Sequence, residues 1–115
     1  MFFSQKFLYG IFFALILTIL ETSGQSLLRK FYLNKSKNFI LPLTTWFIYG
    51  ICVLVLYHGY NYVNEGTLEV LWNAGTNTII PITGIILFNE KLNSLGIFGI
   101  FLTLIGGTLV GISQN

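Results

Sequence analysis

Residues 7–33 read FLYGIFFALILTILETSGQSLLRKFYL, and this stretch decides the fold. It is apolar almost without interruption as far as Leu20, where Glu21 and a short polar patch follow. As a helix rising about 1.5 Å per residue, positions 7–28 span roughly 33 Å, enough to cross a hydrocarbon core about 30 Å thick. The stretch therefore predicts a transmembrane helix over about residues 7–31.

Glu21 lies inside this predicted span. A charged side chain at the middle of a bilayer costs roughly 2.5–3.5 kcal/mol on insertion scales, so such residues usually face a protein interior or a water-filled cavity. Residues three and four apart share a helix face, and the face that carries Glu21 is mostly small and polar: Ala14, Thr18, Gly24, Gln25 and Leu28. We therefore expect Glu21 to be a binding residue, with Thr18 and Gln25 beside it.

Composition extends this interpretation to the whole chain of 115 residues. Charged residues make up 9% of it, against about 25% in soluble proteins, and apolar residues make up 54%. Four apolar segments cover about residues 7–31, 39–57, 67–88 and 95–112. We expect a single domain over residues 1–115, an all-α membrane protein whose four transmembrane helices form a bundle. Such a chain would be a multi-pass integral protein, and we expect it in the cell membrane.

The third segment, 67–88, is the least hydrophobic of the four. Polar and aromatic side chains fall near one face of it: Glu69, Trp72, Asn73, Thr76 and Thr83. Pro81 and Gly84 predict a kink or a loosened backbone in its second half. We interpret this face as the lining of a pathway, and the alternative is hydrogen bonding between helices, worth only about 0.6 kcal/mol per contact on average. In the second segment, Tyr49 lies deep enough that its hydroxyl needs a partner.

The fourth segment, 95–112, carries no charge and several glycines. Gly99 and Gly106 are two helical turns apart and mark one face with small residues, where another helix can approach closely. This helix therefore predicts an assembly surface.

Nothing in the sequence indicates bond cleavage. The chain has no nucleotide-binding loop, catalytic triad or pair of catalytic carboxylates, and no Cys/His cluster indicates a metal site. Cys52 is the only cysteine, so no intrachain disulfide can form. We expect neither an enzyme nor a cofactor, and no nucleic-acid partner.

Several of these features, taken together, resemble a known family. Residues 21–30 (ETSGQSLLRK) resemble the first helix of the small multidrug resistance family, which belongs to the drug/metabolite transporter superfamily. Further similar features follow in chain order: Tyr62, Gly66 and Trp72-Asn73-Ala74-Gly75 around the start of the third helix, residues 84–90 (GIILFNE) at its end, and Gly99 with Gly106 on the fourth.

The resemblance implies a dimeric, proton-coupled exporter of small organic cations. Glu21 would bind proton and cation in competition, and Trp72 and Tyr49 would form an aromatic wall, which attracts cations by roughly 0.5–2 kcal/mol. The partners would be a small organic cation, the proton, the lipid bilayer, and a second copy or a homologous subunit. Quaternary ammonium compounds, guanidinium and polyamines all remain open as substrates.

The chain departs from the family pattern in three places. Glu69 stands where a second aromatic is usual. We keep two interpretations of it: a further substrate contact that favours a polar cation, or a solvated residue near the membrane interface. Asn64 stands where a loop proline is usual. Positive charge is biased, because the first loop and its flanks carry Arg29, Lys30, Lys35 and Lys37, the third loop carries Lys91, and the other side has only Lys6. This bias predicts that loops 1 and 3 are cytoplasmic.

Two other functions stay open at this point. The segment Gly24-Gln25, Leu27-Leu28 and a basic end also resembles small lipid-linked aminosugar flippase subunits of the same superfamily, which lack the acid of the first helix. The first of these two functions also includes a metabolite-permease subunit. The second function is that of a non-transporting membrane scaffold, in which Glu21 would be a neutral, hydrogen-bonded residue.

Overall fold

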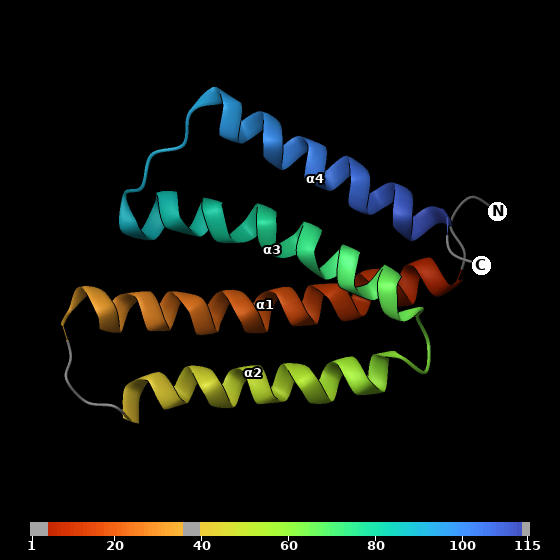
Figure 1. Cartoon of the computed structure of the whole chain (residues 1–115), viewed down its shortest axis with the longest axis horizontal. Helices are drawn as coiled ribbons and strands as arrows, with labels where there is room; N and C mark the ends of the chain where they lie inside the picture. Colours follow the sequence, from red (N-terminus) through yellow and green to blue (C-terminus); the bar gives the residue numbers. More distant parts are fainter. Residues whose placement is uncertain (1–4, 36–39, 114–115) are drawn as a thin grey trace.

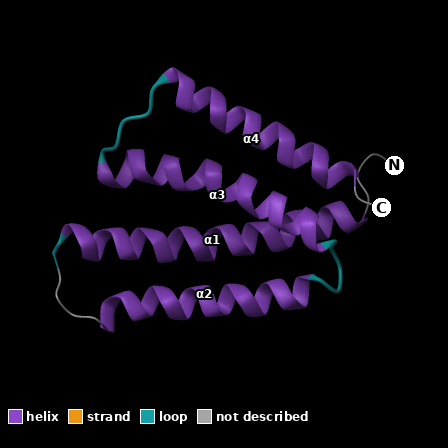
Figure 2. Ribbon diagram, in the orientation of Figure 1, coloured by secondary structure: helices purple, strands orange, loops and turns teal. Residues whose placement is uncertain are grey.

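The computed structural model describes residues 5–35 and 40–113, and within this part the chain is four helices joined by short loops (Figure 2). The helices are α1 (Gln5–Leu33), α2 (Ile40–Gly59), α3 (Glu65–Phe88) and α4 (Ser94–Ser113). All four are long and apolar enough to cross a membrane, which confirms the prediction of an all-α chain with four membrane-length helices. No bound differs from the expected range by more than two residues, and the expected start at residue 39 lies outside the described residues.

The four helices form a flat layer in the order α2, α1, α3, α4, and the start of α3 crosses α1 (Figure 1). α1 packs against both α2 and α3, whereas α4 packs against α3 and barely touches α1. The Cα atoms extend over 51 × 36 × 16 Å, so the molecule is flat, although thicker than a single helix, whose Cα atoms lie on a cylinder about 4.6 Å across. α2 and α4 lie on opposite sides of α1 and α3, so the four helices do not close into a bundle around one common core.

Small residues allow α1 to be approached closely from both sides. Towards α2, the Thr45 hydroxyl donates a hydrogen bond to the Gly24 carbonyl oxygen at 3.1 Å, and a Cβ at Gly24 would meet Ile48 at 3.4 Å. Towards α3, Gly75 lies against Thr18 so closely that a Cβ there would overlap the threonine hydroxyl. The small stripe read from the sequence of α1 is therefore shared between two neighbouring helices.

The buried core lies where α1, α2 and α3 meet near the α2–α3 loop. Leu17, Cys52 and Leu68 are the largest side chains described as fully buried. They form one cluster with Phe13, Ala14, Val63 and Leu71, and Trp72 packs against it. This cluster fixes how α1 and α3 are rotated relative to each other.

α3 continues through Pro81 as one helix and changes direction along its length (Figure 1). The hydroxyls of Thr76, Thr78 and Thr83 donate to carbonyl oxygens of their own helix, at 2.8–3.1 Å for the shortest bond of each. α3 ends at Phe88, and Asn89 caps it in a left-handed backbone conformation (φ 55°), which asparagine tolerates. The hydroxyls of Thr76, Thr78 and Thr83 are therefore hydrogen-bonded within α3 and not to neighbouring helices.

α4 uses its glycines in two different ways. Gly107 and Gly111 are buried, the first against Ala74 of α3 and the second against Phe7 and Leu71. Gly99 and Gly106 are exposed, and no described atom lies within 4 Å of the place where their Cβ would stand. The two glycines named from the sequence thus face open space, while the other two hold α4 to the layer.

Candidate functional site

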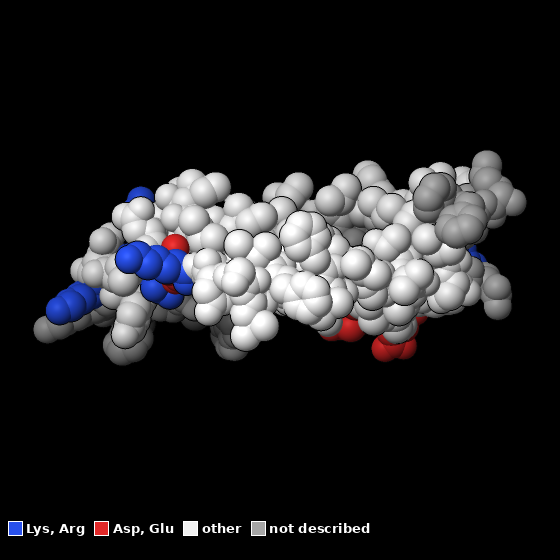
Figure 3. All heavy atoms as spheres, turned by 90° about the horizontal axis from the view of Figure 1, so that it is seen from above, with Lys and Arg blue, Asp and Glu red and all other residues white. Residues whose placement is uncertain are grey.

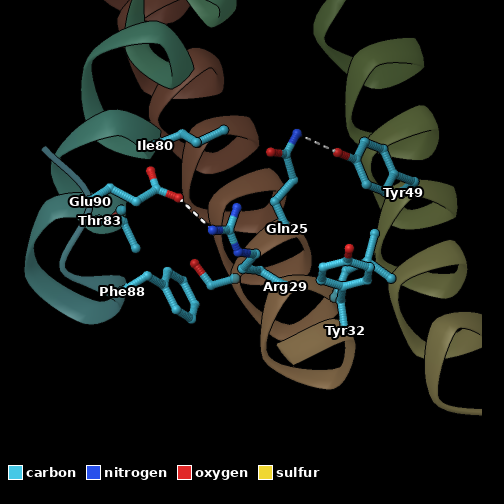
Figure 4. A pocket seen from close by; sticks show the side chains of 11 residues that line it. Gln25, Arg29, Tyr32, Tyr49, Ile80, Thr83, Phe88 and Glu90 are labelled. Carbon is cyan, nitrogen blue, oxygen red and sulfur yellow. Dashed lines mark hydrogen bonds and ion pairs between the residues drawn. The ribbon is translucent and has the colours of Figure 1, made fainter. Parts of the chain in front are cut away.

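Three side chains from α1 and α2 form a hydrogen-bonded chain around Glu21. The Tyr49 hydroxyl donates to Glu21 Oε2 at 3.2 Å, and Gln25 Nε2 donates to the Tyr49 oxygen at 3.0 Å. Glu21 and Gln25 are one turn apart on α1, so a single tyrosine of α2 reaches both. Figure 4 shows the Gln25 amide and the Tyr49 hydroxyl pointing towards each other.

Glu21 lines a hollow of about 510 Å³ between α1, α3 and α4, here called the acidic hollow. This volume falls within the range of about 300–1,000 Å³ that small-molecule sites occupy. Amide, hydroxyl and apolar groups line it with Glu21: Gln25, Asn73, Thr76, Asn77, Ile80, Pro81, Leu92, Gly96, Gly99, Ile100 and Thr103. No described lining residue is cationic, so the carboxylate is free to attract a positive charge.

A second hollow, of about 540 Å³, lies nearer the α1–α2 and α3–α4 loops and shares Gln25 and Ile80 with the first (Figure 4). Arg29 crosses it to pair with Glu90, with 2.9 Å between Nη2 and Oε1, and its guanidinium lies 5.6 Å from the centre of the Phe88 ring. Gly84 leaves room for the Glu90 carboxylate, since a Cβ there would overlap it. The ion pair ties the α3–α4 connection to the end of α1.

Positive charge gathers at one end of the molecule. Figure 3 shows most of the lysine and arginine side chains at the end that holds the α1–α2 and α3–α4 loops. Lys37, one of the charges counted in the sequence, lies outside the described residues. Glu90 neutralises Arg29, but Lys30, Lys35 and Lys91 are exposed at this end. The bias counted from the sequence thus corresponds to one pole of the layer.

The structure separates the residues that the sequence grouped with Glu21. Tyr49 donates to Glu21 but lines the second hollow, and Gln25 is linked to Glu21 through Tyr49. Thr18, Trp72 and Glu69 are, like Tyr49, not among the described residues that line the acidic hollow, so neither ring of the expected aromatic wall lines it. Thr18 is 97% buried against Gly75, and Trp72 packs against the core, its indole N–H without a described hydrogen-bond partner. Glu69 is exposed and accepts a hydrogen bond of 3.5 Å from Asn73 Nδ2, one turn further along α3.

Asn77 and the pair Arg29–Glu90 belong to the two hollows but were not singled out from the sequence. Asn77 could have been predicted from the sequence, because it lies four residues after Asn73 and therefore on the same face of the helix. Nothing local signals the ion pair, because its members stand 61 positions apart and meet only when α3 ends against α1. Within the described residues, no three His, Cys, Asp or Glu side chains come together as a metal site would require.

Comparison with known proteins adds no relative. The chain matches no family model, no curated protein and no solved structure. The resemblance to the small multidrug resistance family therefore stays a prediction from the sequence, and the site must be judged by its own chemistry.

Proposed function

We propose that this protein is an antiporter that exchanges small organic cations for protons across a cell membrane, with Glu21 as the exchanging group. The observation that carries the proposal is the placement of Glu21, a carboxylate on a membrane-length helix, at the wall of a hollow without cationic lining among the described residues. In a bilayer, such a charge needs a proton, a cation or water beside it.

Competition for one carboxylate couples the two ions. With a proton bound, Glu21 is neutral and has no charge with which to hold a cation. With a cation bound, the carboxylate is neutralised by an ion pair, and Tyr49 still donates to Oε2. Gln25 holds the Tyr49 oxygen, which leaves the phenolic hydrogen directed at Glu21. Either ligand satisfies the site and excludes the other, which is the requirement for exchange.

The active form in this proposal is a pair of layers, formed by two copies or by one copy and a homologous subunit. Gly99 lines the acidic hollow, and with Gly106 it faces open space. A second helix packed on these glycines would cover the hollow from the side that the layer leaves open. Close approach at small residues is how transmembrane helices usually associate.

One observation favours a second candidate, a subunit of a lipid-linked sugar flippase. A further hollow, of about 550 Å³ between the ends of α1 and α3, is mainly apolar but includes Lys30. An ammonium group above an apolar groove suits the phosphate of a lipid-linked sugar. This candidate needs no proton coupling at Glu21, and that difference separates it from the first.

Proton release on cation binding tests the proposal. Purified protein in weakly buffered detergent solution receives quaternary ammonium, guanidinium and polyamine salts in turn, and the pH of the solution is recorded. We expect wild type and Glu90→Gln, which removes a carboxylate outside the acidic hollow, to release protons, and Glu21→Gln to release none. Release that persists in Glu21→Gln rules out exchange at Glu21, and silence of the wild type across the panel favours the flippase subunit or the scaffold.

A further inference from the structure

A third hollow lies at the opposite end of the molecule from the cluster of lysine and arginine, and nothing in the proposed exchange uses it. It measures about 510 Å³ and is formed by the start of α1, the end of α2 and the α2–α3 loop. Among the described residues, five aromatic rings and two other side chains contribute to its wall: Tyr9, Phe12, Phe13, His58 and Tyr62, with Gln5 and Leu8. We call it the aromatic hollow.

The rings of the aromatic hollow form one contiguous cluster. Tyr9 and Tyr62 lie with ring centres 5.0 Å apart, and Phe13 stacks on Tyr62 at 5.8 Å. His58 meets Phe13 and Tyr62 edge-on at 6.1 and 5.6 Å. Because Phe13 belongs to the buried core, the cluster is anchored to the fold and does not depend on exposed side chains alone.

The charge of this hollow suits a cation without a hydrogen-bond donor. The faces of aromatic rings are negative and attract ammonium groups, and groups of rings are how proteins hold quaternary ammonium ligands. None of the described lining residues carries a permanent charge. The neighbouring cation of α1, Lys6, reaches to Asn64 Oδ1 at 3.5 Å. No carboxylate is among the lining residues that the structure describes, so recognition would rest on the rings.

We propose that the aromatic hollow is a binding site for a quaternary ammonium group, separate from Glu21. Tyr9 and Glu21 are twelve positions apart on α1, which is roughly 18 Å along the helix axis. One ligand chemistry, the N-methylated ammonium, has two sources in a membrane: a free organic cation, or the headgroup of phosphatidylcholine. The site stands on its ring geometry and does not require that Glu21 exchange protons.

The experiment measures binding of choline by saturation-transfer NMR, in a Glu21→Gln background so that the acidic hollow contributes nothing. The protein is held in nanodiscs of phosphatidylethanolamine, whose headgroup lacks methyl groups. The neutral isostere 3,3-dimethylbutan-1-ol serves as the ligand control. We expect saturable binding of choline, and affinity for the isostere at least about fivefold weaker, because the isostere has the same shape without the charge.

Variants locate the site. Tyr9→Leu and Tyr62→Leu each remove a ring from the wall, and we expect each to weaken choline binding about two- to fivefold, and the pair together about tenfold. Tyr57→Leu is the matched control, since Tyr57 is at the same end of α2, is 77% exposed, and does not line the hollow. Choline binding in Tyr57→Leu should equal that of the parent.

Repeating the titration in phosphatidylcholine nanodiscs separates the two sources. Weaker apparent binding of choline there assigns the site to the lipid headgroup, and equal binding assigns it to a free cation. No saturable binding in phosphatidylethanolamine, equal affinity for the neutral isostere, or an equal loss in Tyr57→Leu would each overturn the proposal. None of these outcomes depends on whether the wild type is an antiporter.

Discussion

The Glu21 carboxylate receives its hydrogen bond from a different helix, and this makes its chemistry depend on how α1 and α2 are packed. Tyr49 donates to Glu21 and accepts from Gln25, so one phenol links the acid to the amide one turn away. Hydrogen bonds to charged groups contribute roughly 1.5–3 kcal/mol. Tyr49 therefore holds one carboxylate oxygen of Glu21 in place, and this carboxylate is the group that binds the cation in the proposed exchange.

Replacement of Tyr49 by phenylalanine tests this role. Tyr49→Phe keeps the ring but removes the donor, so Glu21 Oε2 loses the hydrogen bond that holds it in place. We predict that the apparent cation affinity falls about tenfold, which is about the contribution of one hydrogen bond to a charged group. Isothermal titration of the wild type and the variant with the same cation measures it.

Tyr57→Phe is the control for this prediction, because Tyr57 is another tyrosine of α2 and is exposed. Its affinity should match the wild type. An unchanged affinity in Tyr49→Phe would show that the hydrogen bond to Glu21 contributes nothing to cation binding.

At the scale of helices, α1 is the central element because it alone contacts both α2 and α3 extensively. Its contact with α3 depends on Gly75, where a Cβ would overlap the Thr18 hydroxyl. Thr18 is buried, and rotation of its branched side chain brings its methyl group to the same place. The α1–α3 spacing, and with it the width of the acidic hollow, therefore rests on a glycine.

We predict that Gly75→Ala lowers the free energy of unfolding by about 1–3 kcal/mol, the usual cost of an overpacked contact. Thermal unfolding in detergent measures the loss, and Gly75→Ala in a Thr18→Ala background should recover most of it. Gly50→Ala is the control, since no described atom lies within 4 Å of a Cβ there, and its added helix propensity should leave stability equal or higher. Equal melting temperatures for Gly75→Ala and Gly50→Ala would contradict the predicted contact.

The sequence predicted the helices well and the site in part, for physical reasons that differ between residues. Hydropathy locates the helices because a bilayer admits little else, and spacing places Gln25 beside Glu21 because both belong to one helix. Trp72 turned out to pack in the core because the rotation of α3 depends on Leu68 and Leu71, which no local pattern reveals. The Arg29–Glu90 ion pair could not be predicted either, because its two members meet only in the folded chain.

As a whole, the molecule is a flat layer, 16 Å thick between Cα atoms, and many of its large apolar side chains are exposed. Lipid can cover apolar side chains, but it cannot satisfy Glu21, Asn73 and Asn77, which need water or protein beside them. The open glycines of α4 lie where a second layer would complete the enclosure. A second layer would therefore supply protein surface beside the polar side chains that lipid cannot satisfy.

Bulky replacements on this glycine face should break the pair without unfolding the chain. We predict that Gly99→Leu with Gly106→Leu shifts the protein to the monomer, because both positions face open space in the single layer. Single-molecule photobleaching in liposomes measures subunit number, and Phe101→Leu, an exposed change elsewhere on α4, is the control. Dimers that persist in the double variant would place the interface elsewhere.

The most direct test of the central claim is coupled movement of cation and proton through reconstituted protein. Liposomes are loaded with an organic cation that released protons in detergent, and diluted into cation-free solution, while a trapped dye reports internal pH. The account predicts that cation leaves as protons enter, so that the lumen acidifies with the wild type and not with Glu21→Gln. Cation efflux without acidification, or equal acidification in Glu21→Gln, would contradict proton exchange at Glu21.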